Sequence, residues 1–134
     1  MKSIIALFIA IIILTGCNQS KAIHPQPSHT AISIGNPTAE EVLAQNPKAD
    51  IFQYKDIVYT NASEIEWVQQ AELTIGDHVG TITKQFTYDL TFEHEMATKL
   101  PVDTEIYEPA KKIGPVLIVT INDKEIRYLG LIEG

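Results

Sequence analysis

The sequence predicts an α+β domain, in which a mainly antiparallel sheet of hairpins carries two short helices packed on one face. Three observations lead to this prediction. Two segments begin with helix-capping patterns, Thr38–Glu41 and Ser63–Glu66. Two β-rich regions are interrupted by turn-forming pairs, Lys55-Asp56 and Asn122-Asp123. Residues 86–92 alternate apolar and polar side chains, which is typical of a half-buried strand.

The chain begins with the three-part pattern of an export signal. Lys2 precedes an unbroken apolar run from Ile4 to Leu14, and small residues follow. A helix of this length spans only about 16 Å, whereas the bilayer core is about 30 Å thick. The run is therefore predicted to be a removed signal and not a membrane-spanning helix.

Leu14-Thr15-Gly16-Cys17 resembles the lipobox of bacterial lipoproteins, and Cys17 is the only cysteine of the chain. The resemblance implies that residues 1–16 are a signal peptide and that a diacylglyceryl group is attached to the Cys17 sulfur. A free or buried thiol behind an ordinary signal peptide is the alternative. Two acyl chains would anchor the mature protein stably. With one cysteine, no disulfide can form within the chain.

Length and charge limit the possible architectures and partners. Removal of the signal leaves room for one domain of about 100 residues. The chain has 10 basic and 17 acidic residues and a formal net charge of −7. This balance disfavours binding to nucleic acid or to an anionic lipid surface, since both require clustered Lys or Arg. Solubility is the simplest explanation of the acidic excess, and an acidic docking surface is the alternative.

Residues 17–37 are predicted to be a lipidated, flexible linker. Prolines stand among small polar residues there, without an apolar period. A flexible linker of this length has an r.m.s. reach of about 25 Å. His24 and His29 lie in the linker and could share a metal ion. A metal site needs three or four converging ligands, so ordinary polar linker residues are the preferred interpretation.

A single domain is predicted over residues 38–134, beginning with a short helix that opens at Thr38. Pro47 is expected to end this helix after Asn46. A hairpin with strands over residues 51–54 and 57–60 follows. Its tyrosines are predicted to pack against neighbouring strands and not to bind a ligand.

The second helix is predicted to be capped by Ser63 and to continue to Leu73. Its apolar side combines Ile65 with Val68, three residues apart, and Trp67 with Ala71, four apart. Trp67 is the only tryptophan of the chain. We predict that it packs between helix and sheet and is not a platform for a ligand.

A turn is predicted at Gly76-Asp77-His78, followed by a strand from Val79 to Lys84. The segment lacks the Lys and Ser/Thr that follow a phosphate-binding loop. Glu93-His94-Glu95 suggests a metal or acid–base cluster. Adjacent residues of a strand point to opposite faces, so only Glu93 and Glu95 would share a side, and a polar end of the 86–92 strand is preferred.

The last third of the chain is predicted to contain a strand over 104–107, a basic turn at Lys111-Lys112 and a hairpin over 116–132. Residues 116–121 are apolar on both faces, which predicts a central strand covered on one side by a helix. The return strand is expected to point Glu125 and Arg127 outward, and Ile126 and Tyr128 inward.

Residues 97–134 resemble the C-terminal module of small lipoproteins and exported proteins of Gram-positive, mostly Bacillus-like bacteria. In those proteins an LP-x-G-T-x-I-Y segment precedes a short hairpin. The segment stands here as Leu100–Tyr107, LPVDTEIY, with Asp103 where such relatives commonly carry Gly. The resemblance implies no enzyme activity and no catalytic residue.

Three classes of function follow from these observations. The first is a non-enzymatic binding or accessory module, lipid-anchored through Cys17 on the extracytoplasmic face of the cell membrane, with a protein or envelope partner and no cofactor. The second is a cell-envelope hydrolase using a carboxylate pair from Glu93, Glu95, Asp103 and Glu105. The third is a metal-binding lipoprotein using His24, His29, His78 and His94. The first is preferred, because no nucleophile–base, metal or phosphate pattern is present in the sequence.

Overall fold

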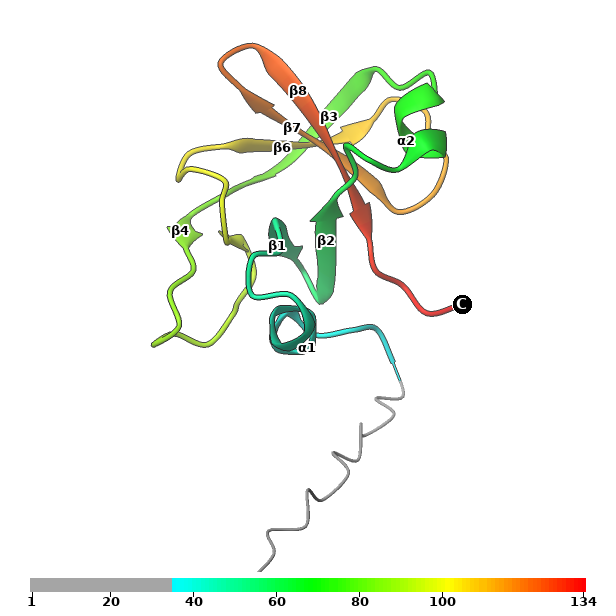
Figure 1. Cartoon of the computed structure of the whole chain (residues 1–134). Coiled ribbons are helices and arrows are strands. Elements are labelled where there is room, and N and C mark those ends of the chain that lie inside the picture. The colour runs from blue at the N-terminus through cyan, green and yellow to red at the C-terminus, as the bar shows by residue number, and fades with distance from the viewer. Residues whose placement is uncertain (1–34) are drawn as a thin grey trace, which may run out of the picture. The chain divides into compact units, whose positions relative to one another are not determined.

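The computed structural model of the protein describes residues 35–134. The predicted signal, Cys17, His24, His29 and most of the linker lie outside the described residues. The described part contains two helices and eight strands (Figure 1). In chain order they are α1 (Ala39–Gln45), β1 (Ile51–Tyr54), β2 (Ile57–Asn61), α2 (Glu66–Gln70), β3 (Ile75–Thr81), β4 (Lys84–Gln85), β5 (Met96–Ala97), β6 (Glu105–Pro109), β7 (Val116–Ile121) and β8 (Lys124–Gly130).

All eight strands belong to one sheet, in the order β3-β6-β7-β8-β2-β1-β5-β4. The fold is therefore dominated by the sheet, and the two helices are short, as predicted. Tight hairpins join β1 to β2 and β7 to β8. The other neighbours are joined by longer connections, and β4 pairs with β5 in parallel. The prediction of a mainly antiparallel sheet of hairpins is thus confirmed only in part.

The two faces of the sheet support different parts of the core. Phe52, Tyr59, Tyr128 and Leu117 belong to the largest buried cluster. Since successive strand residues point to opposite faces, Ile51, Val58 and Ile118 lie on the other face. Ile51 and Val58 pack with Leu43 of α1, and Ile118 packs with Val68 of α2.

Helix α1 forms where its capping pattern predicts. The Thr38 hydroxyl accepts a hydrogen bond from the Glu41 N–H at 3.2 Å, and the Glu41 carboxylate accepts one from the Thr38 N–H at 2.9 Å. The helix ends at the C-cap Asn46, next to Pro47, as expected. Leu43 is its main buried contact with the sheet.

Helix α2 departs from its prediction in start, length and buried side. The Ser63 hydroxyl and N–H donate to Asn61 Oδ1, at 2.6 and 2.9 Å, so Ser63 does not cap the helix. The helix begins after Ile65 and ends at Gln70, well before Leu73. Val68 is fully buried, whereas Trp67 is 49% exposed. Successive side chains on a helix differ in direction by about 100°. Because Val68 faces the sheet, its neighbour Trp67 points away from it.

Arg127 does not point freely outward as predicted. Its guanidinium donates hydrogen bonds to the carbonyls of Val68, Gln69 and Ala71, at 2.5, 3.1 and 2.9 Å. These carbonyls stand at the C-terminal end of α2, where helical partners are missing. Arg127 therefore fixes the end of α2 to β8. Its neighbour Glu125 is exposed and Tyr128 is fully buried, as predicted.

Gly76-Asp77-His78 is part of strand β3, so the predicted turn is wrong. The pairing of β3 with β6 is irregular on both sides of His78, which lies opposite Tyr107. A Cβ atom at Gly76 would lie 2.7 Å from the Ala110 nitrogen and 2.8 Å from the Glu108 carbonyl oxygen. The glycine thus marks a close approach of two backbones and not a turn.

The strand predicted over residues 86–92 is a loop. Phe86, Leu90 and Phe92 pack into the core cluster beside α1, which accounts for three of the four apolar positions, whereas Tyr88 is 75% exposed. A turn between Thr87 and Leu90 interrupts the extended backbone, with the Leu90 N–H donating to the Thr87 carbonyl. The alternation reflects burial against α1 and β1 and not pairing with another strand.

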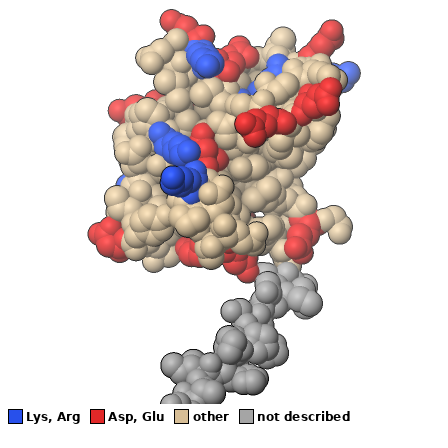
Figure 2. Space-filling model, in the orientation of Figure 1, with Lys and Arg blue, Asp and Glu red and all other residues tan. Residues whose placement is uncertain are grey.

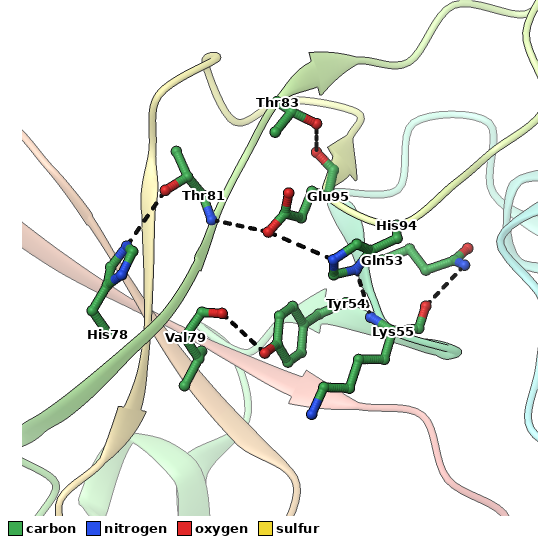
Figure 3. A network of polar contacts seen from close by, with 9 residues as sticks. All are labelled: Gln53, Tyr54, Lys55, His78, Val79, Thr81, Thr83, His94 and Glu95. Carbon is green, nitrogen blue, oxygen red and sulfur yellow. Dashed lines mark hydrogen bonds and ion pairs between the residues drawn. The ribbon is translucent and has the colours of Figure 1, made fainter.

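The sheet curls so that the segment from β3 to β4 supplies both of its terminal strands. At this seam the Tyr54 hydroxyl donates to the Val79 carbonyl at 3.0 Å, and the Thr81 N–H donates to Glu95 Oε1 at 3.3 Å (Figure 3). Gly80 leaves room for both side chains, since its Cβ would lie 2.8 Å from Glu95 Oε1. Residues far apart in sequence therefore close the sheet through side chains.

Glu93-His94-Glu95 is a turn and not the end of a strand. Glu95 has a positive φ of 62°, so His94 and Glu95 do not point to opposite faces. The His94 Nε2 atom lies 3.6 Å from Glu95 Oε1, and His94 Nδ1 accepts a hydrogen bond from the Lys55 N–H at 2.8 Å (Figure 3). Both residues belong to the seam.

The predicted central strand and the C-terminal hairpin are confirmed, and the strand predicted over residues 104–107 is observed as β6, Glu105–Pro109. β7 lies inside the sheet, and its side chains contact the main core on one face and the α2 cluster on the other. Asn122 and Asp123 adopt φ of 49° and 62°, the conformation of a tight hairpin turn. Asp103 has a φ of 69°, so it adopts the left-handed conformation that favours Gly and that Asp tolerates better than most other residues.

Tyr128 connects the core to a polar pair at its edge. Its hydroxyl donates to Asp50 Oδ1 at 2.9 Å, and the Asn61 amide donates to Asp50 Oδ2 at 2.8 Å. Burial, and then the Asp50 carboxylate, hold the pKa of Tyr128 far above that of a free tyrosine. Burial likewise raises the pKa of Tyr59.

We expect the free energy of unfolding to fall as the pH rises above about 10. The unfolded chain then releases the Tyr128 proton while the folded protein retains it, and this difference favours unfolding. Tyr128→Phe should cost about 1 kcal/mol at neutral pH, because Asp50 loses a donor, and should make the alkaline decline shallower. Urea unfolding of both proteins between pH 8 and 11 measures this. Parallel declines would contradict it.

Within the described residues, no helix is long and apolar enough to cross a membrane.

Candidate binding site

A solvent-open, mainly apolar hollow of about 370 Å³ lies between the end of α1, the start of β1 and the 86–92 loop. Its apolar side chains are those of Leu43, Pro47, Ala49, Phe86 and Tyr88. Its polar groups are Thr98 and two exposed lysines, Lys48 and Lys99. An apolar concave surface with a few converging polar groups is the usual form of a small-ligand site.

Thr98 brings the two lysines together. Its hydroxyl donates to the Ala49 carbonyl at 2.8 Å and accepts a hydrogen bond from the Ile51 N–H at 3.0 Å. The Thr98 N–H donates to the Ile51 carbonyl at 2.9 Å. Lys48 immediately precedes Ala49, and Lys99 immediately follows Thr98. These hydrogen bonds therefore place two lysines from distant parts of the chain beside one hollow.

The 86–92 loop contributes the aromatic side chains of Phe86 and Tyr88 to the lining of the hollow. Phe86 packs against Phe92 with ring centroids 4.8 Å apart, and against Tyr88 at 5.5 Å. Tyr88 is 75% exposed, yet its hydroxyl donates to the Pro47 carbonyl at 2.9 Å. That bond holds the exposed ring beside the end of α1 and keeps this side of the hollow in place.

A second hollow of about 400 Å³ adjoins the first and shares Lys48, Ala49 and Lys99 with it. Its other lining residues are polar, namely Asn46, Asp50, Thr60, Asn61, Ser63 and Glu64. The Lys48 side chain and the Lys99 side chain thus stand between an apolar hollow and a polar one. Among the ion pairs of residues 35–134, none involves either lysine.

The charge on the apolar hollow contrasts with the rest of the domain. Acidic side chains are spread over the face of the molecule in Figure 2, and basic side chains are few. Among the residues that the structure describes, no Asp or Glu lines the apolar hollow, and both charged residues of its lining are positive. The polar hollow has two acids beside the lysines, and a third hollow on the β6–β8 side of the sheet is acidic.

That acidic hollow contains two of the four carboxylates proposed for a hydrolase. Asp103 and Glu105 line it together with Asp123 and Glu125. Glu105 accepts a hydrogen bond from the Tyr107 hydroxyl at 2.7 Å, and this bond raises the pKa of Tyr107. Glu95 belongs to the seam, and Glu93 does not line the hollow. The four carboxylates that the sequence suggested as one group therefore do not share one site in the structure.

The two histidines of the described domain occupy separate places (Figure 3). His78 on β3 packs edge-on against Tyr107, with ring centroids 5.3 Å apart, and lies 3.4 Å from the Thr81 hydroxyl. His94 is bonded to Lys55 and lies beside Glu95. Within residues 35–134, no three His, Cys, Asp or Glu side chains are grouped so that they could hold a metal ion.

Comparison of the chain with protein-family models, curated proteins and solved structures found no match in any of the three. The candidate site therefore stands on its own geometry. No pattern in the sequence distinguished Lys48, Lys99 or Tyr88 as candidate binding residues. No spacing rule connects a lysine after a helix-ending proline with another that follows a two-residue strand.

Proposed function

We propose that this chain is a membrane-anchored lipoprotein with a non-enzymatic, extracytoplasmic binding domain. The observation that carries the proposal is the lipobox Leu14–Cys17, which follows an apolar signal and ends in the only cysteine. The domain behind it is an α+β domain with both helices on one face of its sheet. Its binding surface is the hollow beside Lys48 and Lys99, and a protein or another component of the envelope is the partner.

The arrangement of the domain supports binding better than hydrolysis. The apolar hollow has a volume of about 370 Å³, a mainly apolar lining and two lysines that form no ion pair within residues 35–134, which are the properties of a ligand site. A carboxylate hydrolase would use Asp103 and Glu105, the two sequence candidates that share a hollow. Glu105 is hydrogen-bonded to Tyr107, so this second candidate function is the less supported one.

The anchor is tested by metabolic labelling of the protein with palmitate. We expect the wild type to carry the label and to sediment with membranes, because two acyl chains hold a protein stably on a bilayer. Cys17→Ser should lose all of the label. The matched control combines Cys17→Ser with Ser20→Cys, which keeps one thiol but moves it out of the lipobox, and it should also be unlabelled. An unlabelled wild type, or a labelled control, would refute lipidation at Cys17.

A further inference from the structure

We propose that the apolar hollow binds a small amphiphilic anion, an alkyl or aryl group that carries a carboxylate or phosphate. This inference names the ligand class of the binding module proposed above. The inference rests on that proposed function only in placing the ligand outside the cytoplasm. The site itself is argued from the lining of the hollow, its charges and the polar surface beside it.

The apolar lining selects the body of the ligand. Leu43 and Ala49, which are almost fully buried, line the hollow together with Phe86 and Tyr88. A hollow of about 370 Å³ holds about a dozen non-hydrogen atoms at roughly 30 Å³ each. This is the size of a short acyl chain or a substituted aromatic ring. A folded protein partner could insert one side chain there, whereas a volume of about 370 Å³ lies within the usual range of small-molecule sites.

The two lysines select the charge of the ligand. Acids outnumber bases 17 to 10 in the chain, yet within the described part of the chain the hollow is lined by two cations and no acid. Neither Lys48 nor Lys99 is ion-paired within the described residues, so both ammonium groups are available to a ligand. Carboxylate and phosphate oxygens are the usual acceptors of charge-assisted hydrogen bonds from lysine.

The polar hollow beside the apolar one favours an amphiphilic ligand over a purely apolar ligand. Lys48 and Lys99 line both hollows, so an anionic group placed between them has apolar surface on one side and polar side chains on the other. Of the two acids in the polar hollow, Asp50 already accepts hydrogen bonds from Tyr128 and Asn61. The acidic hollow near Glu105 has the opposite charge and does not fit this ligand. The charge pattern therefore restricts the inference to one side of the domain.

The test measures ligand binding to the mature chain, residues 17–134 with Cys17→Ser, by backbone amide NMR titration. The probes are butyrate, hexanoate, octanoate and hexyl phosphate, with 1-hexanol and hexylammonium as uncharged and cationic counterparts. We expect saturable shifts at Lys48, Tyr88 and Lys99, and an affinity that rises roughly twofold to fourfold with each added methylene. Hexanol and hexylammonium should bind at least about tenfold more weakly than hexanoate. Hexyl phosphate should bind more tightly than hexanoate, because it carries more negative charge.

The double variant Lys48→Gln/Lys99→Gln should lower the affinity for octanoate about tenfold, since each solvent-exposed charge contributes modestly. The matched control is Lys84→Gln/Lys124→Gln, which removes the same charge from lysines outside the hollow. The control should bind octanoate within about twofold of the unchanged chain. Circular dichroism confirms that both double variants are folded.

Three results would overturn the inference: no saturable shifts with any anion, equal binding of hexanol and hexanoate, or equal weakening by the control variant. The outcome does not depend on the anchor. Palmitate labelling with no anion binding would reject the ligand class and leave the lipoprotein proposal in place. Anion binding without labelling would reject the anchor and leave the ligand site in place.

Discussion

Phe52→Ala is expected to lower the free energy of unfolding by about 3–5 kcal/mol, the usual cost of truncating a fully buried aromatic residue. Phe52 has no exposed surface. Its ring stacks on Tyr59 at a centroid distance of 5.2 Å and meets Tyr128 edge-on at 5.0 Å. Small domains have a total stability of about 5–15 kcal/mol, so this loss should leave a measurable unfolded fraction. Urea unfolding followed by far-UV circular dichroism measures it.

Trp67→Ala is the matched control for this measurement, because it also removes a large aromatic ring. Trp67 is 49% exposed on α2, and we expect its loss to cost less than about 1 kcal/mol. Equal costs for the two variants would show that the core is not centred on the Phe52 ring. A larger cost for Trp67→Ala would restore the original prediction that Trp67 packs between helix and sheet.

Gly76→Ala should lower the free energy of unfolding by about 2–3 kcal/mol, since an added atom must displace packed backbone. The new Cβ would lie 2.7 Å from the Ala110 nitrogen and 2.8 Å from the Glu108 carbonyl oxygen. No side-chain rotation can relieve a contact with backbone atoms. The pairing of β3 with β6 should loosen, which hydrogen exchange of the Ala110 and His78 amides would detect.

Gly134→Ala is the control for Gly76→Ala, because no atom lies within 4 Å of the Cβ it would add. Its stability should match that of the wild type within about 0.5 kcal/mol. If Gly76→Ala proved equally harmless, the close approach of β3 to the 108–110 segment would be wrong. The turn first predicted at residues 76–78 would then be the better description.

Local chemistry explains why several elements were predicted correctly. The capping box of α1 and the Asn122-Asp123 turn depend on neighbouring residues, whose interactions survive in any fold. The two-sided apolar pattern of residues 116–121 is also independent of the partner, because a strand covered on both faces needs apolar side chains on both. These elements formed as expected.

The failures share a different cause. The alternating segment 86–92 could form a strand only by pairing with another strand. Its apolar side chains pack instead in the core cluster that contains α1. The Ser63 hydroxyl does not cap α2, because it donates a hydrogen bond to the nearby Asn61 side chain instead. A glycine at position 76 is equally consistent with a turn and with a close approach of two backbones. The close approach became evident only from the position of residues 108–110 in the structure.

The sequence by itself predicted the helix α1 and the two tight hairpins, which the structure confirms, because each depends on residues close together in the chain. The export signal and lipidation at Cys17 were also predicted from neighbouring residues, and they remain predictions. Only the tertiary structure decided where the proposed binding surface lies. Lys48 and Lys99 are 51 positions apart, and the link between them is a set of hydrogen bonds made by Thr98 to residues 49–51. Two lysines that are brought together only by the fold leave no periodic pattern or motif in the sequence.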